Sequence, residues 1–211
     1  METIAQQLDT IASQVHEHWQ QKSGARDRAL ANGREAIRNC ANGIRAVHRH
    51  DTALAEQLLE RARALLAETA VSLEGHPDLL HAGYVEDAQK EYAEGRLTLA
   101  LVNGLPLPTP DALGVSAAAY LNGAAEAVGE LRRYILDLLR QGKPEQCESL
   151  LAAMDDIYSV LVTMDFPDAM TGGLRRSTDN ARGILERTRG DLTMALVQQT
   201  VQRRLEQLTP G

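Results

Sequence analysis

The chain has 211 residues, 44% of them hydrophobic, which is enough to bury a core of ordinary size and argues against disorder throughout. A formal net charge of -7 argues against attraction to nucleic acid over the whole surface, although six arginines between residues 26 and 49 could form a local basic surface. The sequence contains no run of about 18 apolar residues and no signal-peptide pattern. We therefore expect a soluble, cytoplasmic protein without membrane association.

Helix is favoured along nearly the whole chain, because alanine, leucine, glutamate, glutamine and arginine dominate and aromatic residues make up only 3%. Apolar spacing and the breakers between apolar runs predict seven helices, without strand-like alternation or internal repeats. The first four cover about residues 2 to 49, with a candidate interruption near Ser23 and Gly24, then 52 to 73, 78 to Val102 after a turn at 75 to 78, and 116 to 142. The fifth covers about 145 to 162, the sixth opens at 166 to 168, and the seventh runs from Gly190-Asp191 to Leu208. Asp51-Thr52 and Ser116 are candidate N-caps, and the proline-rich stretch 103 to 115 is the one long loop. The expected architecture is a single all-α antiparallel bundle over residues 1 to 211.

The two cysteines, Cys40 and Cys147, stand alone in predicted helices and lack the CxxC spacing of zinc sites. A disulfide framework and a structural zinc site are therefore not expected. Free cysteine commonly packs as a small hydrophobic side chain, so we predict two buried free thiols.

Acidic residues occupy the middle of a stripe on the third predicted helix. The stripe consists of Tyr84, Asp87, Glu91, Glu94, Thr98 and Leu101, whose spacing of three and four residues places them on one face. The fourth predicted helix has a second polar stripe, made of Asn122, Glu126, Glu130, Arg133 and Asp137. Glu91 and Glu94 are three residues apart and Glu126 and Glu130 four apart, so each pair can converge on one point.

These acids have two interpretations, a solvated acidic face or a metal site. Like-charged carboxylates at such spacings repel one another, and a divalent cation would remove that penalty. Carboxylate oxygens suit Mg²⁺ or Mn²⁺. A di-iron centre normally needs two Glu-x-x-His units, which are absent, and the pairs His16/His18 and His48/His50 point to different helix faces. Helical periodicity alone leaves the choice between a solvated face and a Mg²⁺ or Mn²⁺ site open.

Four segments resemble the translin/Trax family and follow one another in the family's order. They are GREAIRNCANGIRAVHR (33 to 49), EYAEG (91 to 95), YLNGAAEAVGELRR (120 to 133) and LRRSTDNARGILERTRGDL (174 to 192). The first is similar to the family's first helix with its His-Arg end, and the second to the Glu-Tyr-x-Glu segment of Trax, the catalytic member. The third has the family's Tyr-Leu, Gly, acid and Gly-Glu-Leu pattern, and the fourth its Leu-Arg-Arg and Arg-Gly section.

By this resemblance, the catalytic and metal-binding acids of Trax correspond to Glu91, Glu94, Glu126 and Glu130. Trax has Asp at the position of Glu126, which would place a cation about one methylene further from that helix. An alternative register that aligns Gly83-Tyr84-Val85-Glu86 with the Trax segment would lose one acid and make Glu86 a ligand. The register with EYAEG keeps both acids and is preferred.

The resemblance implies a metal-dependent endoribonuclease that uses Mg²⁺ or Mn²⁺, binds RNA, expected to be single-stranded, and assembles as a closed homo-oligomer of eight subunits. Arg34, Arg38 and Arg133 are candidate RNA-binding residues, with surface solvation or salt bridges within their own helices as the alternative. One rival hypothesis is a non-catalytic oligomer that binds single-stranded RNA or DNA, as translin does. The other is a scaffolding bundle whose acids are only a solvated face.

Overall fold

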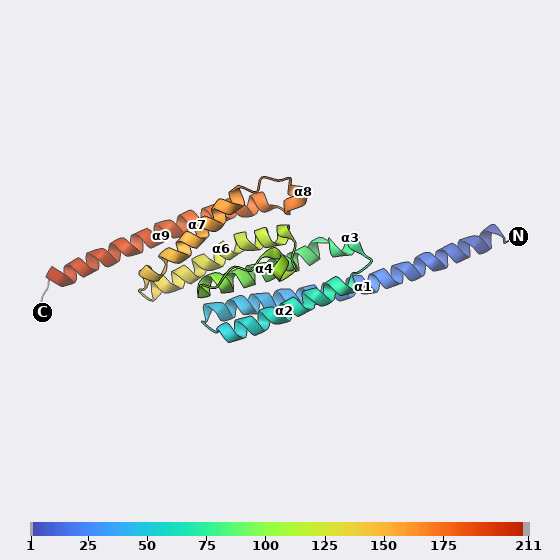
Figure 1. Cartoon of the computed structure of the whole chain (residues 1–211), viewed down its shortest axis with the longest axis horizontal. Helices are drawn as coiled ribbons and strands as arrows, with labels where there is room; N and C mark the ends of the chain where they lie inside the picture. The colour runs from blue at the N-terminus through green and yellow to red at the C-terminus, as the bar shows by residue number, and fades with distance from the viewer. Residues whose placement is uncertain (1, 209–211) are drawn as a thin grey trace.

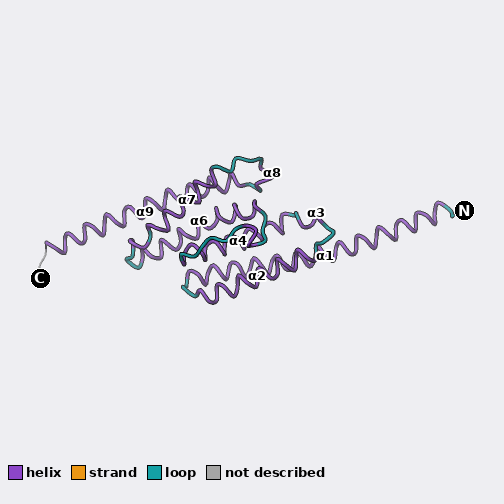
Figure 2. The backbone as a smooth tube through the Cα atoms, in the orientation of Figure 1, coloured by secondary structure: helices purple, strands orange, loops and turns teal. Residues whose placement is uncertain are grey.

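The computed structural model describes residues 2–208, in which helix predominates and no strand occurs, in agreement with the predicted all-α class (Figure 2). The long helices are α1 (Ile4–His48), α2 (Thr52–Ser72), α4 (Gly83–Asn103), α6 (Ala117–Arg140), α7 (Glu148–Val162) and α9 (Leu174–Leu208). Short helices lie in the connections: α3 (Pro77–Leu80), α5 (Pro110–Leu113), η1 (Pro144–Gln146) and α8 (Asp168–Thr171). The predicted N-caps are confirmed, since the side chain of Asp51 accepts from the Leu54 N–H and that of Ser116 from the Ala119 N–H.

Two predicted helix boundaries are absent. Helix α1 runs through Gly24 without interruption, and α9 runs through Gly190, so the last two predicted helices are continuous from Leu174 onward. The predicted start of the sixth helix at residues 166 to 168 leads only into the short helix α8. A glycine inside a helix costs only about 1 kcal/mol, which packing of the flanking residues can offset. Thr188 and Leu192 on either side of Gly190 are fully buried or nearly so, which explains why tertiary packing overrides the glycine there.

The helices form three adjoining layers, with α4 and α6 in the middle (Figure 1). Helices α1 and α2 pack on one side of this central pair, and α7 and α9 pack on the other. Most of α4 faces α1 and α6, whereas α6 also contacts α7 and α9. The polar stripes of α4 and α6 therefore meet inside the bundle and do not both face solvent.

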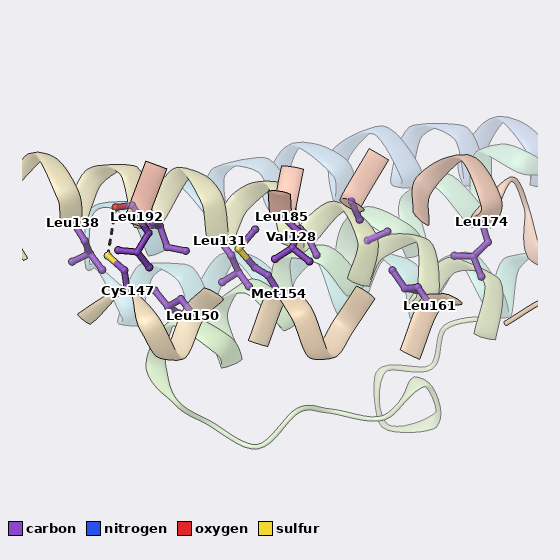
Figure 3. Packing of buried hydrophobic residues seen from close by; sticks show 13 residues of the cluster. Val128, Leu131, Leu138, Cys147, Leu150, Met154, Leu161, Leu174, Leu185 and Leu192 are labelled. Atoms are coloured by element: carbon purple, nitrogen blue, oxygen red, sulfur yellow. Dashed lines mark hydrogen bonds between the residues drawn. The ribbon is translucent and has the colours of Figure 1, made fainter. Parts of the chain in front are cut away.

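The larger apolar core lies between α6, α7 and α9 (Figure 3). Its fully buried members on α6 are Val128, Leu131 and Ile135. Cys147 is part of this core and Cys40 of a second one between α1, α2 and α4. Both cysteines are buried and free, as predicted.

Two apolar ridges at the ends of the bundle are exposed. The N-terminal ridge, on the part of α1 that projects from one end, consists of Ile4, Leu8, Ile11, Val15 and Trp19. The C-terminal ridge, on the part of α9 that projects from the other end, includes Met194, Val197 and Val201 (Figure 1). Their spacing of three and four residues places each set along one side of its helix. Within residues 2–208, no helix combines the length and apolar character that a membrane span needs.

Candidate metal centre between α4 and α6

Helices α4 and α6 approach each other closely at Gly123. A Cβ atom added at this glycine would lie 2.7 Å from the Lys90 carbonyl oxygen and 2.9 Å from the Glu94 backbone nitrogen. Both distances are shorter than van der Waals contact, so only glycine allows this approach. The glycine of the YLNGAAE segment thus brings α4 next to Glu126, which lies one turn further along α6.

Three of the four predicted acids converge at this crossing. Glu91, Glu94 and Glu126 each offer a carboxylate oxygen, and these oxygens lie within 4.8 Å of one another. Glu94 is only 8% exposed, whereas Glu91 and Glu126 are half-buried. In the part of the chain that the structure describes, no other group of three or more acidic, histidine or cysteine side chains converges so closely.

The electrostatics of this acid cluster (Glu91, Glu94 and Glu126) are unfavourable. Burial raises the pKa of Glu94 to about 8, with further contributions from the negative charges of Glu91, Glu126 and Glu130. Burial also raises the pKa of Glu91, and the charge of Glu126 adds to the effect. A pKa displaced in this way means that the site disfavours the ionised carboxylate, which is the form that binds a cation.

Lys90 is a member of the site that helical spacing did not reveal. Its Nζ donates to Oε1 of Glu126 at 2.8 Å and lies 3.7 Å from Oε1 of Glu91. The first contact joins residues 36 positions apart on two helices, so periodicity within one helix could not predict it. Lys90 also lines a polar cavity of about 160 Å³ together with Glu86 and Glu126. Glu86, the ligand in the alternative register, thus lies beside the acid cluster and outside it.

Glu130 lies outside the acid cluster and contacts His48. The Nε2 of His48, a side chain only 5% exposed, donates to Oε2 of Glu130 at 2.5 Å. This hydrogen bond lowers the pKa of Glu130, and the nearby Arg133 adds to the lowering. Sequence reasoning set His48 aside as a poor chelating partner of His50, and the His48–Glu130 contact spans 82 residues. Glu130 therefore flanks the cluster, and its charge still acts on Glu94.

The three candidate RNA-binding arginines lie outside the acid cluster. Arg34 and Arg38 are exposed on α1, where Arg38 forms an ion pair of 3.3 Å with Glu35. The Arg133 side chain is 56% exposed, and its Nη1 lies 3.8 Å from Oε2 of Glu130. Arg133 is consequently the candidate closest to the acids, and its predicted salt bridge with Glu130 is present.

The donors of the acid cluster fit Mg²⁺ or Mn²⁺. All three are carboxylate oxygens, the hard ligands that these cations prefer, and Glu91 and Glu126 are partly exposed to solvent. Histidine does not belong to the converging group in the described residues, which argues against the di-iron alternative.

The chain is similar in sequence to one curated protein and in structure to several solved ones. No family model matches it. An uncharacterized protein of Methanocaldococcus jannaschii is 29% identical over 174 residues, which cover 81% of this chain and 76% of that protein.

Three solved structures are also similar. The crystal structure of archaeal AfC3PO is 32% identical, with a TM-score of 0.81 over 88% of this chain and 97% of that chain. The structure of an AfC3PO–duplex RNA complex is 32% identical, with a TM-score of 0.79 over 88% and 96%. Fungal apo-NeC3PO, at 18% identity and a TM-score of 0.79 over 87% and 96%, shares the fold. With 32% identity to AfC3PO over nearly the whole of its length, the chain belongs to the translin/Trax family, the family of the C3PO proteins.

Proposed function

We propose that this chain is a metal-dependent endoribonuclease that binds RNA as a homo-oligomer. The observation that carries the proposal is the convergence of Glu91, Glu94 and Glu126 from two helices within 4.8 Å, in a member of the translin/Trax family. A solvated acidic face would not need to bury Glu94 or displace its pKa to about 8. The cost of this arrangement supports a functional interpretation of the acids.

The roles of the acids follow from their burial and contacts. Glu91, Glu94 and Glu126 would hold Mg²⁺ or Mn²⁺. When bound, such a cation lowers the pKa of water and offsets negative charge on a phosphate. Glu130 lies outside the converging group, so we assign it to the flank of the site, where His48 keeps its carboxylate oriented and ionised.

The substrate assignment rests on the family and on the exposed arginines. AfC3PO has been solved as a complex with duplex RNA, which supports RNA as the ligand of this chain. We propose that Arg133, exposed beside Glu130, pairs with a phosphate that enters the site, and that Arg34 and Arg38 contact the RNA backbone from α1. Single-stranded RNA is the proposed substrate, and duplex RNA is the natural comparison.

The apolar ridges support assembly. The N-terminal ridge exposes five large apolar side chains along one side of a projecting helix, and exposed apolar patches of this kind commonly mark association surfaces. We propose that these ridges pack between copies of the chain in a closed oligomer of eight subunits. Light scattering should then give a mass several times that of the 23.0 kDa chain, whereas a monomer at every salt concentration would contradict the assembly.

The nuclease activity can be tested with labelled single-stranded and duplex RNA. Cleavage should require Mg²⁺ or Mn²⁺, stop with EDTA, and leave 3′-hydroxyl and 5′-phosphate ends. Glu126→Gln lowers the ligand charge at nearly constant volume and should abolish cleavage. The matched control is Glu86→Gln, which changes a neighbouring acid outside the cluster and should leave cleavage intact.

The other outcomes separate the rival hypotheses. Binding of RNA without cleavage in either metal would favour the non-catalytic RNA- or DNA-binding oligomer. Absence of both binding and cleavage would favour a scaffolding bundle. Loss of cleavage in Glu86→Gln with full activity in Glu91→Gln would favour the alternative register, in which Glu86 is a ligand.

A further inference from the structure

Lys90 places a positive charge against two carboxylates of the acid cluster. Its Nζ lies between the carboxylates of Glu126 and Glu91, at 2.8 Å and 3.7 Å. The lysine comes from α4 and Glu126 from α6, so the ammonium group bridges the two helices at the acid cluster itself. The other two lysines of the chain lie elsewhere: Lys22 forms an ion pair with Asp78, and Lys143 donates to Gln141.

The charges of the site determine how many cations it can hold. Three ionised carboxylates carry three negative charges, and Lys90 supplies one positive charge. One divalent cation then makes the cluster neutral, whereas a second would leave two positive charges in a partly buried site, which is costly. Glu130 is left out of this count because it lies outside the acid cluster and the charge of Arg133, whose Nη1 lies 3.8 Å from its Oε2, partly offsets its own.

We propose that Lys90 takes the place of a second metal ion, so that each subunit binds one divalent cation in the absence of substrate. The inference rests on the proposed metal centre and specifies its composition. The same carboxylates, without Lys90, would carry three uncompensated charges and offer Glu91 and Glu126 as bridging ligands to a second cation.

The test is the stoichiometry of Mn²⁺ binding to the full chain, measured by electron paramagnetic resonance after chelator treatment. The wild type should bind one Mn²⁺ per chain. Lys90→Met, which keeps the length of the side chain and removes its charge, should bind two, with the broadened spectrum of a coupled Mn²⁺ pair. Lys90→Arg, which keeps the charge, should bind one, and so should Lys22→Met, the control with the same loss of charge away from the site.

Each alternative result has a distinct meaning. Two Mn²⁺ ions on the wild type would overturn the inference whatever the variants do. One Mn²⁺ on Lys90→Met, at equal or higher affinity, would show that Lys90 is a structural ion pair or a competitor of the first cation, and would also overturn it. No Mn²⁺ on any form would remove the proposed metal centre itself. Circular dichroism and oligomer size, measured for Lys90→Met, for a second charge-removing variant, Lys90→Gln, and for the wild type, verify that the variants are folded.

Discussion

Helix α6 has two long faces that differ in chemistry. One face buries Val128, Leu131 and Ile135 against α7 and α9 (Figure 3), and the other presents Glu126 and Glu130 to α4 and α1. Burial of apolar side chains stabilises the fold by about 1.5–3 kcal/mol for each large residue. Burial of acids works against folding unless positive charge is supplied. Helix α6 therefore combines an apolar face that stabilises the bundle with an acidic face whose burial does not stabilise it.

The largest expected loss of stability follows from truncating a side chain of the apolar face of α6. Leu131→Ala removes a fully buried side chain and leaves a cavity between α6, α7 and α9, so the free energy of unfolding should fall by about 3 kcal/mol. Urea unfolding measures this loss. Mn²⁺ affinity at temperatures where the variant is folded should stay within about threefold of wild type, because Leu131 packs into the core between α6, α7 and α9 and is not one of the converging acids. A collapse of Mn²⁺ affinity in the folded variant would show that the two faces are coupled.

Gly123→Ala should damage the acid face with a somewhat smaller loss of stability. The added methyl group would meet the Lys90 carbonyl at 2.7 Å, so α4 and α6 must separate, at a cost of about 2 kcal/mol. Separation moves Glu126 away from Glu91 and Glu94, and Mn²⁺ affinity should fall at least tenfold. Gly190→Ala is the control, since its added methyl group meets no neighbouring atom within 4 Å. Unchanged Mn²⁺ affinity in Gly123→Ala would contradict the role given to the close approach.

Glu94→Gln should stabilise the protein when no metal is present. The folded-state pKa of about 8 exceeds the ordinary value of 4.5, so ionising Glu94 costs nothing below about pH 4.5 and its full cost applies above about pH 8. One pKa unit corresponds to about 1.4 kcal/mol, and allowing for relaxation we expect a gain of roughly 2 kcal/mol at pH 8.5. At pH 4.5 the variant and wild type should unfold alike. Added Mn²⁺ should reverse the order at pH 8.5, and equal stabilities at both pH values would contradict the raised pKa.

The smallest change in the free energy of unfolding is expected for a residue that belongs to neither face of α6. Arg38 is exposed and paired with Glu35, so Arg38→Ala should leave the free energy of unfolding within about 0.5 kcal/mol of wild type. If Arg38 contacts a phosphate, RNA affinity should fall a few-fold and the salt dependence of binding should weaken by about one charge. Arg189→Ala, which removes a paired arginine on α9, is the control. Identical RNA affinities and salt slopes for the two variants would exclude Arg38 from the interface.

The sequence predicted those features of the site that lie along one helix. Spacing of three and four residues placed Glu91 with Glu94 and Glu126 with Glu130, and the family resemblance selected the same acids. Which acids meet depends on the packing between helices, where Gly123 sets the separation of α4 and α6. The contacts of Lys90 and His48 with acids 36 and 82 residues away have no counterpart in helical periodicity. They could be found only once the helices were placed side by side.

The fold likewise has features that local sequence predicts and features that depend on packing between helices. Composition and apolar spacing predicted the all-α class and the caps Asp51 and Ser116, because these depend on local preferences. The continuity of α9 through Gly190 depends on the burial of its flanking residues, which no local signal reveals.

Anomalous diffraction from crystals grown with Mn²⁺ would locate the cation on which the proposed chemistry depends. We expect one anomalous peak per subunit, within about 2.0–2.3 Å of oxygens from Glu91, Glu94 and Glu126, with Lys90 still beside Glu126 and Glu130 still bonded to His48. A map without a peak between α4 and α6, at Mn²⁺ concentrations that support RNA cleavage, would contradict the assignment of these acids.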